Sequence, residues 1–207
     1  MDANTLRLVA ITDDLRDGAA GLVARAQAAV RGGATMVQLR LKDADARTMV
    51  EVGRALVAAV PAGVPVIVND RLDVALVAGA AGVHVGPDDL PAGAVRRLVP
   101  PGFLVGASVG SDAEIVLARG ADYVGIGPLY DTSSKPDAGR AIGAVAFARL
   151  ARSCRLPAVA IGGIDATNAA GAMIAGAAGV AVIRAVLGAK DPETAARAIR
   201  AAMEGER

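Results

Sequence analysis

Eight short apolar runs, separated by longer alanine-rich segments, constrain the fold of this chain more than any other feature of its sequence. Most of the runs are continuous and rich in β-branched residues, which is typical of parallel strands buried on both faces. Strands are predicted over residues 6–12, 36–40, 64–69, 82–85, 104–108, 123–126, 158–161 and 180–183. Their strict alternation with helical segments favours an α/β fold.

The segments between the runs have helical patterns. Helices are predicted over residues 19–31, 47–59, 111–119 and 143–153, and a last helix over residues 192–203 closes the chain. Ser111 and Glu114 have the spacing of a capping box at the start of one helix. Asp165 or Thr167 is expected to cap another.

Eight strands that alternate with helices form either a closed (β/α)8 TIM barrel or a doubly wound open sheet. The dinucleotide-binding open sheets carry a glycine-rich turn after the first strand, whereas here that strand ends in Ile11-Thr12-Asp13-Asp14. The chain has 207 residues, which suits a barrel with short loops. No linker or composition shift marks a second domain, so we predict a single barrel over residues 1–207.

Composition excludes several classes of partner and of binding site. The net charge is +1, which gives no electrostatic argument for nucleic acid or an anionic membrane surface. Cys154 is the single cysteine, which excludes an internal disulfide and a cysteine-built metal site. No apolar stretch reaches the ~20 residues of a membrane span. We expect a cytoplasmic protein, and the alanine-rich outer helices leave a homo-oligomer open.

Polar side chains stand at the predicted ends of most strands. Arg40 and Lys42 follow the second strand, Asp70 follows the third, and Asp89 lies in the loop after the fourth. In such barrels the chemistry lies at the carboxyl ends of the strands. Two carboxylates that face two cations suit a Mg²⁺–diphosphate complex, because Mg²⁺ takes one or two protein carboxylates and fills its other positions with phosphate oxygens and water. A surface network of salt bridges is the simpler alternative.

Two further segments indicate phosphate binding. Gly162-Gly163 follows the seventh strand, and Arg184 lies in the turn after the eighth, where we expect a short helix to open a phosphate site. Residues 127–140 form the longest connection and hold hydroxyl side chains beside Lys135, which favours a lid that contacts an anion.

Five strings lie in order along the chain: VQLRLKD at residues 37–43, ND at 69–70, GVHVG at 82–86 followed by Asp89, GP at 127–128 with TSSK at 132–135, and IGGI at 161–164. Together they resemble the thiamine-phosphate synthase family, in register over essentially the whole chain. The resemblance implies a (β/α)8 barrel. It also implies a transferase of thiamine biosynthesis that condenses 4-amino-2-methyl-5-hydroxymethylpyrimidine diphosphate with 4-methyl-5-(2-phosphoethyl)thiazole and uses Mg²⁺.

The resemblance also implies residue roles. Asp70 and Asp89 match the Mg²⁺ ligands, and the diphosphate contacts match Arg40, Lys42, Asn69 and Lys135. Gln38 and Ser108 match contacts to the pyrimidine or the diphosphate. The thiazole phosphate is expected at Thr132, Ser134, Gly162, Gly163, Arg184 and Ala185. The residues expected to act in catalysis are Arg40, Lys42, Ser108 and Lys135.

In the implied reaction, diphosphate leaves the pyrimidine methylene carbon and the thiazole nitrogen replaces it. The nucleophile carries no proton, so no general base is required, and His84 is expected to be a packed, hydrogen-bonded residue. Three positions depart from the commonest family pattern: Val9 replaces a tyrosine, Pro87 a glutamine and Gly110 a histidine. These departures bear on the pyrimidine contacts more than on the reaction type.

Three other functions remain open. A thiazole tautomerase on the same barrel would need the histidine that Gly110 replaces, and would not need Asp70 and Asp89. Another phosphate-binding barrel, such as a sugar-phosphate epimerase, would need an acid–base pair that the strand ends do not supply. A non-catalytic protein that binds thiazole or thiamine phosphate is the third alternative.

Overall fold

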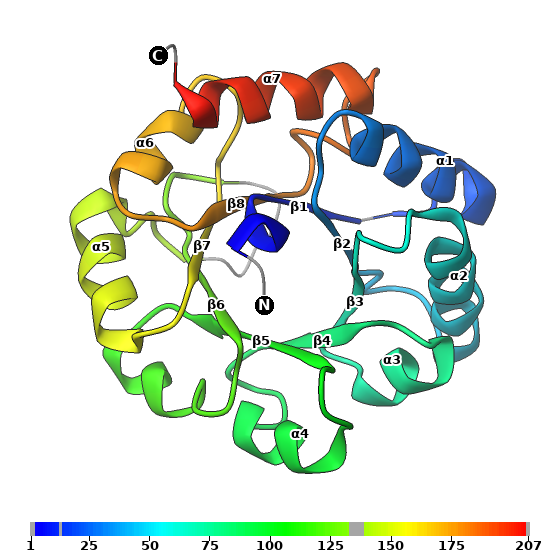
Figure 1. Cartoon of the computed structure of the whole chain (residues 1–207), viewed down its shortest axis with the longest axis horizontal. Helices are drawn as coiled ribbons and strands as arrows, with labels where there is room; N and C mark the ends of the chain where they lie inside the picture. Colours follow the sequence, from blue (N-terminus) through cyan, green and yellow to red (C-terminus); the bar gives the residue numbers. More distant parts are fainter. Residues whose placement is uncertain (1–2, 13, 133–138, 206–207) are drawn as a thin grey trace.

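The apolar runs form eight parallel strands that close into a barrel in the computed structural model of the chain (Figure 1). The structure describes residues 3–12, 14–132 and 139–205. The strands follow chain order round the barrel, and pairing of β1 with β8 closes it. They are β1 (Leu8–Ile11), β2 (Met36–Leu39), β3 (Val66–Asn69), β4 (Gly82–Val85), β5 (Leu104–Val109), β6 (Tyr123–Ile126), β7 (Ala158–Ile161) and β8 (Gly179–Val182). The predicted barrel is therefore confirmed.

Helices surround the strands on the outside (Figure 1). They are α1 (Gly18–Arg31), α2 (Ala46–Ala59), α3 (Leu72–Ala78), α4 (Ala92–Leu98), α5 (Gly143–Cys154), α6 (Ala169–Ile174) and α7 (Pro192–Glu204), with short 3-10 helices η1 (Ala3–Leu6) and η2 (Asp112–Val116). Fully buried residues such as Phe147, Leu56 and Leu22 fill the layer between helices and strands. The small side chains of the strands and helices allow this layer to pack closely.

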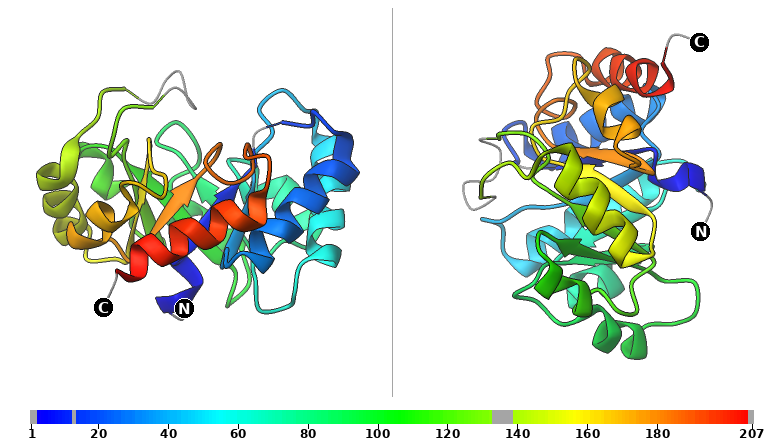
Figure 2. Two further views of the ribbon diagram at one scale, coloured as in Figure 1. Left: turned by 90° about the horizontal axis from the view of Figure 1, so that it is seen from above. Right: turned by 90° about the vertical axis from the view of Figure 1, so that its left-hand side faces the viewer.

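The lumen of the barrel is a second, smaller core. Its members come from inward-facing positions, among them Val9, Met36, Ile67 and Val159. Leu6 belongs to the same cluster and is 0% exposed, although it precedes the first strand. It lies in η1, which closes one end of the barrel; Figure 1 looks onto this helix at the centre, and Figure 2 shows it at the end of the barrel. The lumen is therefore closed at the amino ends of the strands.

The prediction of a helix over residues 111–119 is wrong, because the segment forms only the 3-10 helix η2. The Ser111 hydroxyl donates to the Glu114 carboxylate at 2.9 Å, so the side chains of the predicted capping box do meet. However, the Leu117 carbonyl accepts the Ala92 N–H at 3.1 Å, and the Gly120 carbonyl accepts Arg96 Nε at 3.2 Å. These carbonyls bind the neighbouring α4 segment instead of continuing a helical ladder.

Two smaller predictions also fail. Neither Asp165 nor Thr167 caps α6, which starts at Ala169; the Asp165 carboxylate instead accepts the Thr167 N–H and hydroxyl within the preceding turn. After β8, the expected short helix is a set of turns with a single i to i+4 bond, from the Leu187 N–H to the Ile183 carbonyl. The real side-chain caps are Asp45 for α2 and Asp191 for α7.

Within the described ranges, no helix is both long enough and apolar enough to cross a membrane.

Candidate active site

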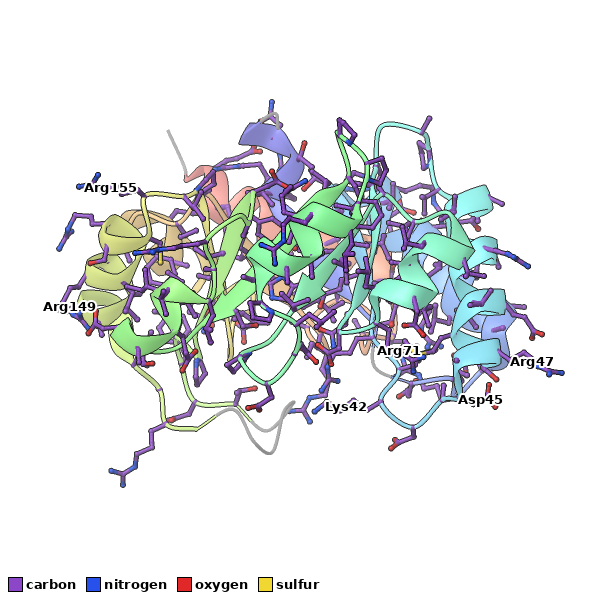
Figure 3. All side chains as sticks on the ribbon, turned by 90° about the horizontal axis from the view of Figure 1, so that it is seen from below. Lys42, Asp45, Arg47, Arg71, Arg149 and Arg155 are labelled. Carbon is purple, nitrogen blue, oxygen red and sulfur yellow. The ribbon has the colours of Figure 1, made fainter. Side chains whose placement is uncertain are left out.

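A cavity of about 320 Å³ opens at the carboxyl ends of the strands. This end of the barrel is opposite η1 (Figure 2). Its floor is apolar and its upper wall is polar. The floor consists of Val9, Ile11, Val159, Ala181 and Ile183. The wall includes Gln38, Arg40, Lys42, Asn69, Asp70, His84, Ser108, Glu114 and Thr132. Figure 3 shows Lys42 at the end of the molecule opposite the blue η1 helix.

The end of β2 is fixed by Thr12, which is 0% exposed. Its hydroxyl donates to the Arg40 carbonyl at 3.0 Å and accepts the Arg40 N–H at 2.8 Å. These two bonds set the point at which Arg40 leaves the strand. Two residues earlier in β2, Gln38 is only 4% exposed, and its side-chain amide has no hydrogen bond with any described residue. A buried amide that faces a cavity is suited to bind a ligand, because buried polar groups otherwise find partners.

Asp70 sits at the tip of β3 in the left-handed region, with φ of 63°. Aspartate tolerates this region better than most residues do, but the conformation still costs free energy. The Asp70 N–H donates to the His84 carbonyl at 2.8 Å, and the Arg71 N–H donates to the Asn69 carbonyl at 2.7 Å. The strand therefore turns sharply at Asp70, and the turn directs its carboxylate toward the loop after β4.

Asp89 meets Asp70 from that loop. The Asp89 carboxylate accepts the Gly86 N–H at 2.7 Å, which fixes the loop. Partial burial and the neighbouring Asp89 carboxylate raise the pKa of Asp70 to about 6, against the opposing effect of Arg40 and Lys42. Asp70 remains partly open to solvent, so desolvation is incomplete. The two carboxylates lie within hydrogen-bonding reach of each other and are flanked by the side chains of Arg40 and Lys42. This arrangement suits a divalent metal ion that carries an anionic ligand.

His84 lies deeper, where the polar wall meets the apolar floor. Its Nδ1 is 3.1 Å from the Tyr123 hydroxyl, and its Nε2 is 3.0 Å from Ser108 Oγ. Both ring nitrogens are thus used in side-chain hydrogen bonds, as expected for a packed histidine. Tyr123 is 2% exposed and belongs to the lumen core.

The predicted thiazole phosphate residues are only partly brought to the cavity. Thr132 lines it, whereas Gly162, Gly163, Arg184 and Ala185 lie at the same end of the barrel but outside the lining. A Cβ at Gly162 would lie 2.5 Å from Pro128 Cβ, and one at Gly163 would lie 2.4 Å from the Asp131 carbonyl oxygen. Close packing against the loop after β6 therefore accounts for both glycines without a phosphate. Ser134 and Lys135 lie outside the described residues.

Two polar lining residues, Tyr123 and Glu114, were not connected with the site by reasoning from the sequence. Tyr123 was assigned only to a strand, and Glu114 only to a helix cap. The Glu114 carboxylate accepts the Gly110 N–H at 2.8 Å and reaches the cavity wall from η2. Alternation along β6 could have placed Tyr123 inside the barrel, because Gly125 and Gly127 share its face and also line the cavity.

Residues 8–186 match the family described as thiamine monophosphate synthase. A thiamine-phosphate synthase from Roseiflexus sp. (strain RS-1) is 52% identical over 194 residues, which cover 92% of this chain and 82% of the relative. Another, from Xanthobacter autotrophicus (strain ATCC BAA-1158 / Py2), is 46% identical over 201 residues, covering 96% and 95%.

Solved structures agree with the sequence comparisons. Thiamine phosphate pyrophosphorylase from Pyrococcus furiosus has a TM-score of 0.85 at 38% identity and covers 98% of this chain and 97% of its own. A 3-hexulose-6-phosphate synthase, 21% identical with a TM-score of 0.71, covers 95% of this chain and 99% of its own and shares the fold alone. From the match over residues 8–186 and these identities, the chain belongs to the thiamine monophosphate synthase family.

Proposed function

We propose that the protein is a thiamine-phosphate synthase, a transferase that joins the pyrimidine diphosphate to the thiazole phosphate and releases diphosphate. Family membership supports the reaction class. The observation that carries the proposal is the Asp70–Asp89 pair beside Arg40 and Lys42 at the mouth of a cavity with an apolar floor. A substrate with a charged diphosphate and an aromatic ring matches both halves of that cavity.

The residues present fit Mg²⁺. Among the described residues no three His, Cys, Asp or Glu side chains gather into one group, so a site built from protein ligands alone, as for zinc, has no support there. A pair of carboxylates suffices for Mg²⁺ when phosphate oxygens and water complete its shell. Asp70 and Asp89 would hold the ion, which when bound would neutralise charge on the leaving diphosphate.

The side chains of the site divide the remaining work. Arg40 and Lys42 would bind non-bridging diphosphate oxygens, and Arg40 offers several donors in a planar fork. The buried Gln38 amide would orient the pyrimidine over the apolar floor. Asn69 and Ser108 supply further hydrogen bonds from the same wall. Orientation and electrostatic stabilisation would thus supply most of the rate enhancement.

The second substrate would enter above the first. We assign the thiazole phosphate to the carboxyl-end loops, with contacts from Thr132, Ser134, Gly162, Gly163, Arg184 and Ala185, whereas Lys135 is assigned to the diphosphate. Because its ring nitrogen is already a free nucleophile, no side chain has to remove a proton.

The test incubates purified protein with both phosphorylated substrates and follows thiamine phosphate by chromatography. Product is expected with Mg²⁺ and not in the presence of a chelator. Product formed in excess chelator would contradict the metal assignment. Isomerisation of the thiazole phosphate alone, without product when the pyrimidine diphosphate is added, would identify a tautomerase, and binding without any turnover would identify a sensor.

Two adjacent aspartates provide a matched pair of variants for the metal site. Asp89→Asn is expected to lower kcat/KM by ~100-fold, the scale of a lost transition-state contact. Asp88→Asn lies one residue away on the exposed side of the same loop and is expected to keep wild-type kinetics. Equal effects of the two substitutions would remove Asp89 from the site.

A further inference from the structure

A chain of three side chains crosses the lumen beneath the proposed pyrimidine site. It runs from Tyr123 on β6 to His84 on β4 and then to Ser108 on β5. The His84 and Tyr123 rings lie 5.5 Å apart between centroids, at an angle of 42°. All three residues line the cavity, and Tyr123, which is 2% exposed, also belongs to the lumen core and anchors the chain there.

The barrel makes room for this chain with glycines. Gly106 stands between the two rings, because it pairs with His84 on one side and with Tyr123 on the other. A Cβ there would lie 2.5 Å from His84 Nδ1 and 2.4 Å from Tyr123 Cζ. A Cβ at Gly125 would lie 3.2 Å from His84 Cε1. Even an alanine at position 106 would push the rings apart and break their hydrogen bond.

The protons along this chain can be ordered in two ways. In the first, the Tyr123 hydroxyl donates to Nδ1, the Nε2–H of His84 donates to Ser108 Oγ, and the Ser108 proton turns to the cavity. In the second, the Ser108 hydroxyl donates to Nε2 and the Nδ1–H of His84 donates to the Tyr123 oxygen. The Tyr123 hydroxyl proton then has no acceptor. Within the described part of the chain, His84 is the only hydrogen-bond partner of the Tyr123 hydroxyl.

The first order leaves no buried donor unpaired. In the reversed order a fully buried O–H would have no acceptor, whereas in the first order the Tyr123 oxygen merely lacks a second donor, which is the smaller loss. Burial also raises the pKa of Tyr123 above its usual range, so the hydroxyl keeps the proton that it donates.

We infer that Tyr123 is a positioning residue that fixes the Nε2–H tautomer of His84 and thereby sets the Ser108 hydroxyl as a hydrogen-bond donor to the bound pyrimidine diphosphate. The identity of that ligand rests on the proposed function; the tautomer does not. The Ser108 side chain has no hydrogen bond with any other described residue, so its proton is available to an acceptor atom of the ligand.

The chain has one histidine, which makes the tautomer directly observable. Protein with uniform ¹⁵N label and without a histidine tag gives imidazole nitrogen signals from His84 alone. At one fixed pH and without substrate, we expect a protonated Nε2 and an unprotonated Nδ1. A protonated Nδ1, or two protonated nitrogens, would overturn the inference.

Substitution then tests the cause. Tyr123→Phe is expected to reduce the Nε2–H population, and Tyr130→Phe, which removes the other tyrosine hydroxyl of the chain, is expected to leave the His84 signals unchanged. A wild-type His84 spectrum in Tyr123→Phe would overturn the inference. If Tyr123→Phe does not fold, the wild-type spectrum still decides.

Kinetics separate positioning from packing. Tyr123→Phe is expected to lower kcat by about tenfold, the scale of one hydrogen bond. The double variant Tyr123→Phe/Ser108→Ala is expected to be no slower than Ser108→Ala, because Tyr123 acts through Ser108. If the double variant loses kcat by the product of the two single losses, Tyr123 does not act through Ser108. If the spectrum is as expected but no thiamine phosphate forms, the proposed function fails and the tautomer assignment stands.

Discussion

At the scale of single residues, Asp70 combines two unfavourable features: a left-handed backbone and a carboxylate placed against a second carboxylate. Such strain persists where the surrounding structure holds it in place, and it concentrates at functional sites. The β3–β4 pairing holds Asp70 here, through its N–H bond to the His84 carbonyl. A bound cation would turn the repulsion between the carboxylates into attraction.

Asp70→Asn is therefore expected to stabilise the metal-free protein. A carboxyl whose pKa is raised on folding holds its proton more tightly in the folded than in the unfolded chain, so its ionisation at pH values above about 6 destabilises the fold. Asparagine removes that charge and still tolerates a positive φ. At pH 7.5 in chelator the melting temperature should rise by roughly 1–3 °C, since solvent screens part of the repulsion.

The same variant should lose its response to ligand. Mg²⁺ with inorganic pyrophosphate should raise the melting temperature of the wild type and of Asp88→Asn, and should leave that of Asp70→Asn unchanged. A lower melting temperature for Asp70→Asn in chelator would contradict the repulsion argument.

Much of this site was predictable at the residue scale, because parallel strands bring their carboxyl ends to one rim. That rule predicts the observed proximity of Asp70 to Asp89 and to Arg40. The sequence did not reveal which partners His84 would take, since Tyr123 and Ser108 are 39 and 24 residues away along the chain. The sequence also did not reveal that Gly162 and Gly163 pack tightly against Pro128 and Asp131, a reason for glycine that leaves the same sequence signal as a phosphate loop.

At the scale of elements, long-range contacts overrode local helix signals in one segment and left them intact in others. Residues 111–119 carry a capping box, yet the Leu117 and Gly120 carbonyls bind the α4 segment, and only the 3-10 helix η2 forms. The effective caps, Asp45 and Asp191, were overlooked. Asp191 precedes a proline at the first helical position, a start signal that was readable from the sequence.

Asp45→Ala is expected to lower the melting temperature by about 2–4 °C at pH 7, the effect of a lost N-cap in a chain of this size. The N–H and hydroxyl of Thr48 lower the pKa of Asp45, so the stabilisation is present above the unfolded pKa of ~3.9 and disappears as the pH falls through the lower folded value. The difference between variant and wild type should therefore shrink as the pH falls below about 4. Asp43→Ala, in the same loop without a capping bond, is the control, and an equal effect there would refute the cap.

At the scale of the whole molecule, the barrel has two unlike ends. The amino ends of the strands are sealed by η1 (Figure 2). The carboxyl ends hold the cavity. The strand order and the end that carries the polar side chains followed from the alternation of elements. The seal did not follow from it, because Leu6 stands only two residues before β1 and was assigned, with Arg7, to that strand. In the folded chain, the Leu6 carbonyl lies where a Cβ at Gly179 would sit, 1.8 Å away, so only glycine allows this seal to form.

Leu6→Ala tests how much the seal contributes to stability. Leu6 is 0% exposed and packs in the lumen cluster, so its truncation leaves a void that rigid strands cannot fill. The free energy of unfolding should fall by about 2–5 kcal/mol, measured by urea titration with an unchanged m-value. Leu98→Ala removes the same atoms from a residue that is 64% exposed on α4, and should change the free energy by less than about 0.5 kcal/mol. Because Leu6 lies at the end of the barrel away from the cavity, the folded fraction of Leu6→Ala should keep wild-type turnover. A loss as small as that of Leu98→Ala would show that η1 merely rests on the barrel, and that the lumen is held closed by its strands alone.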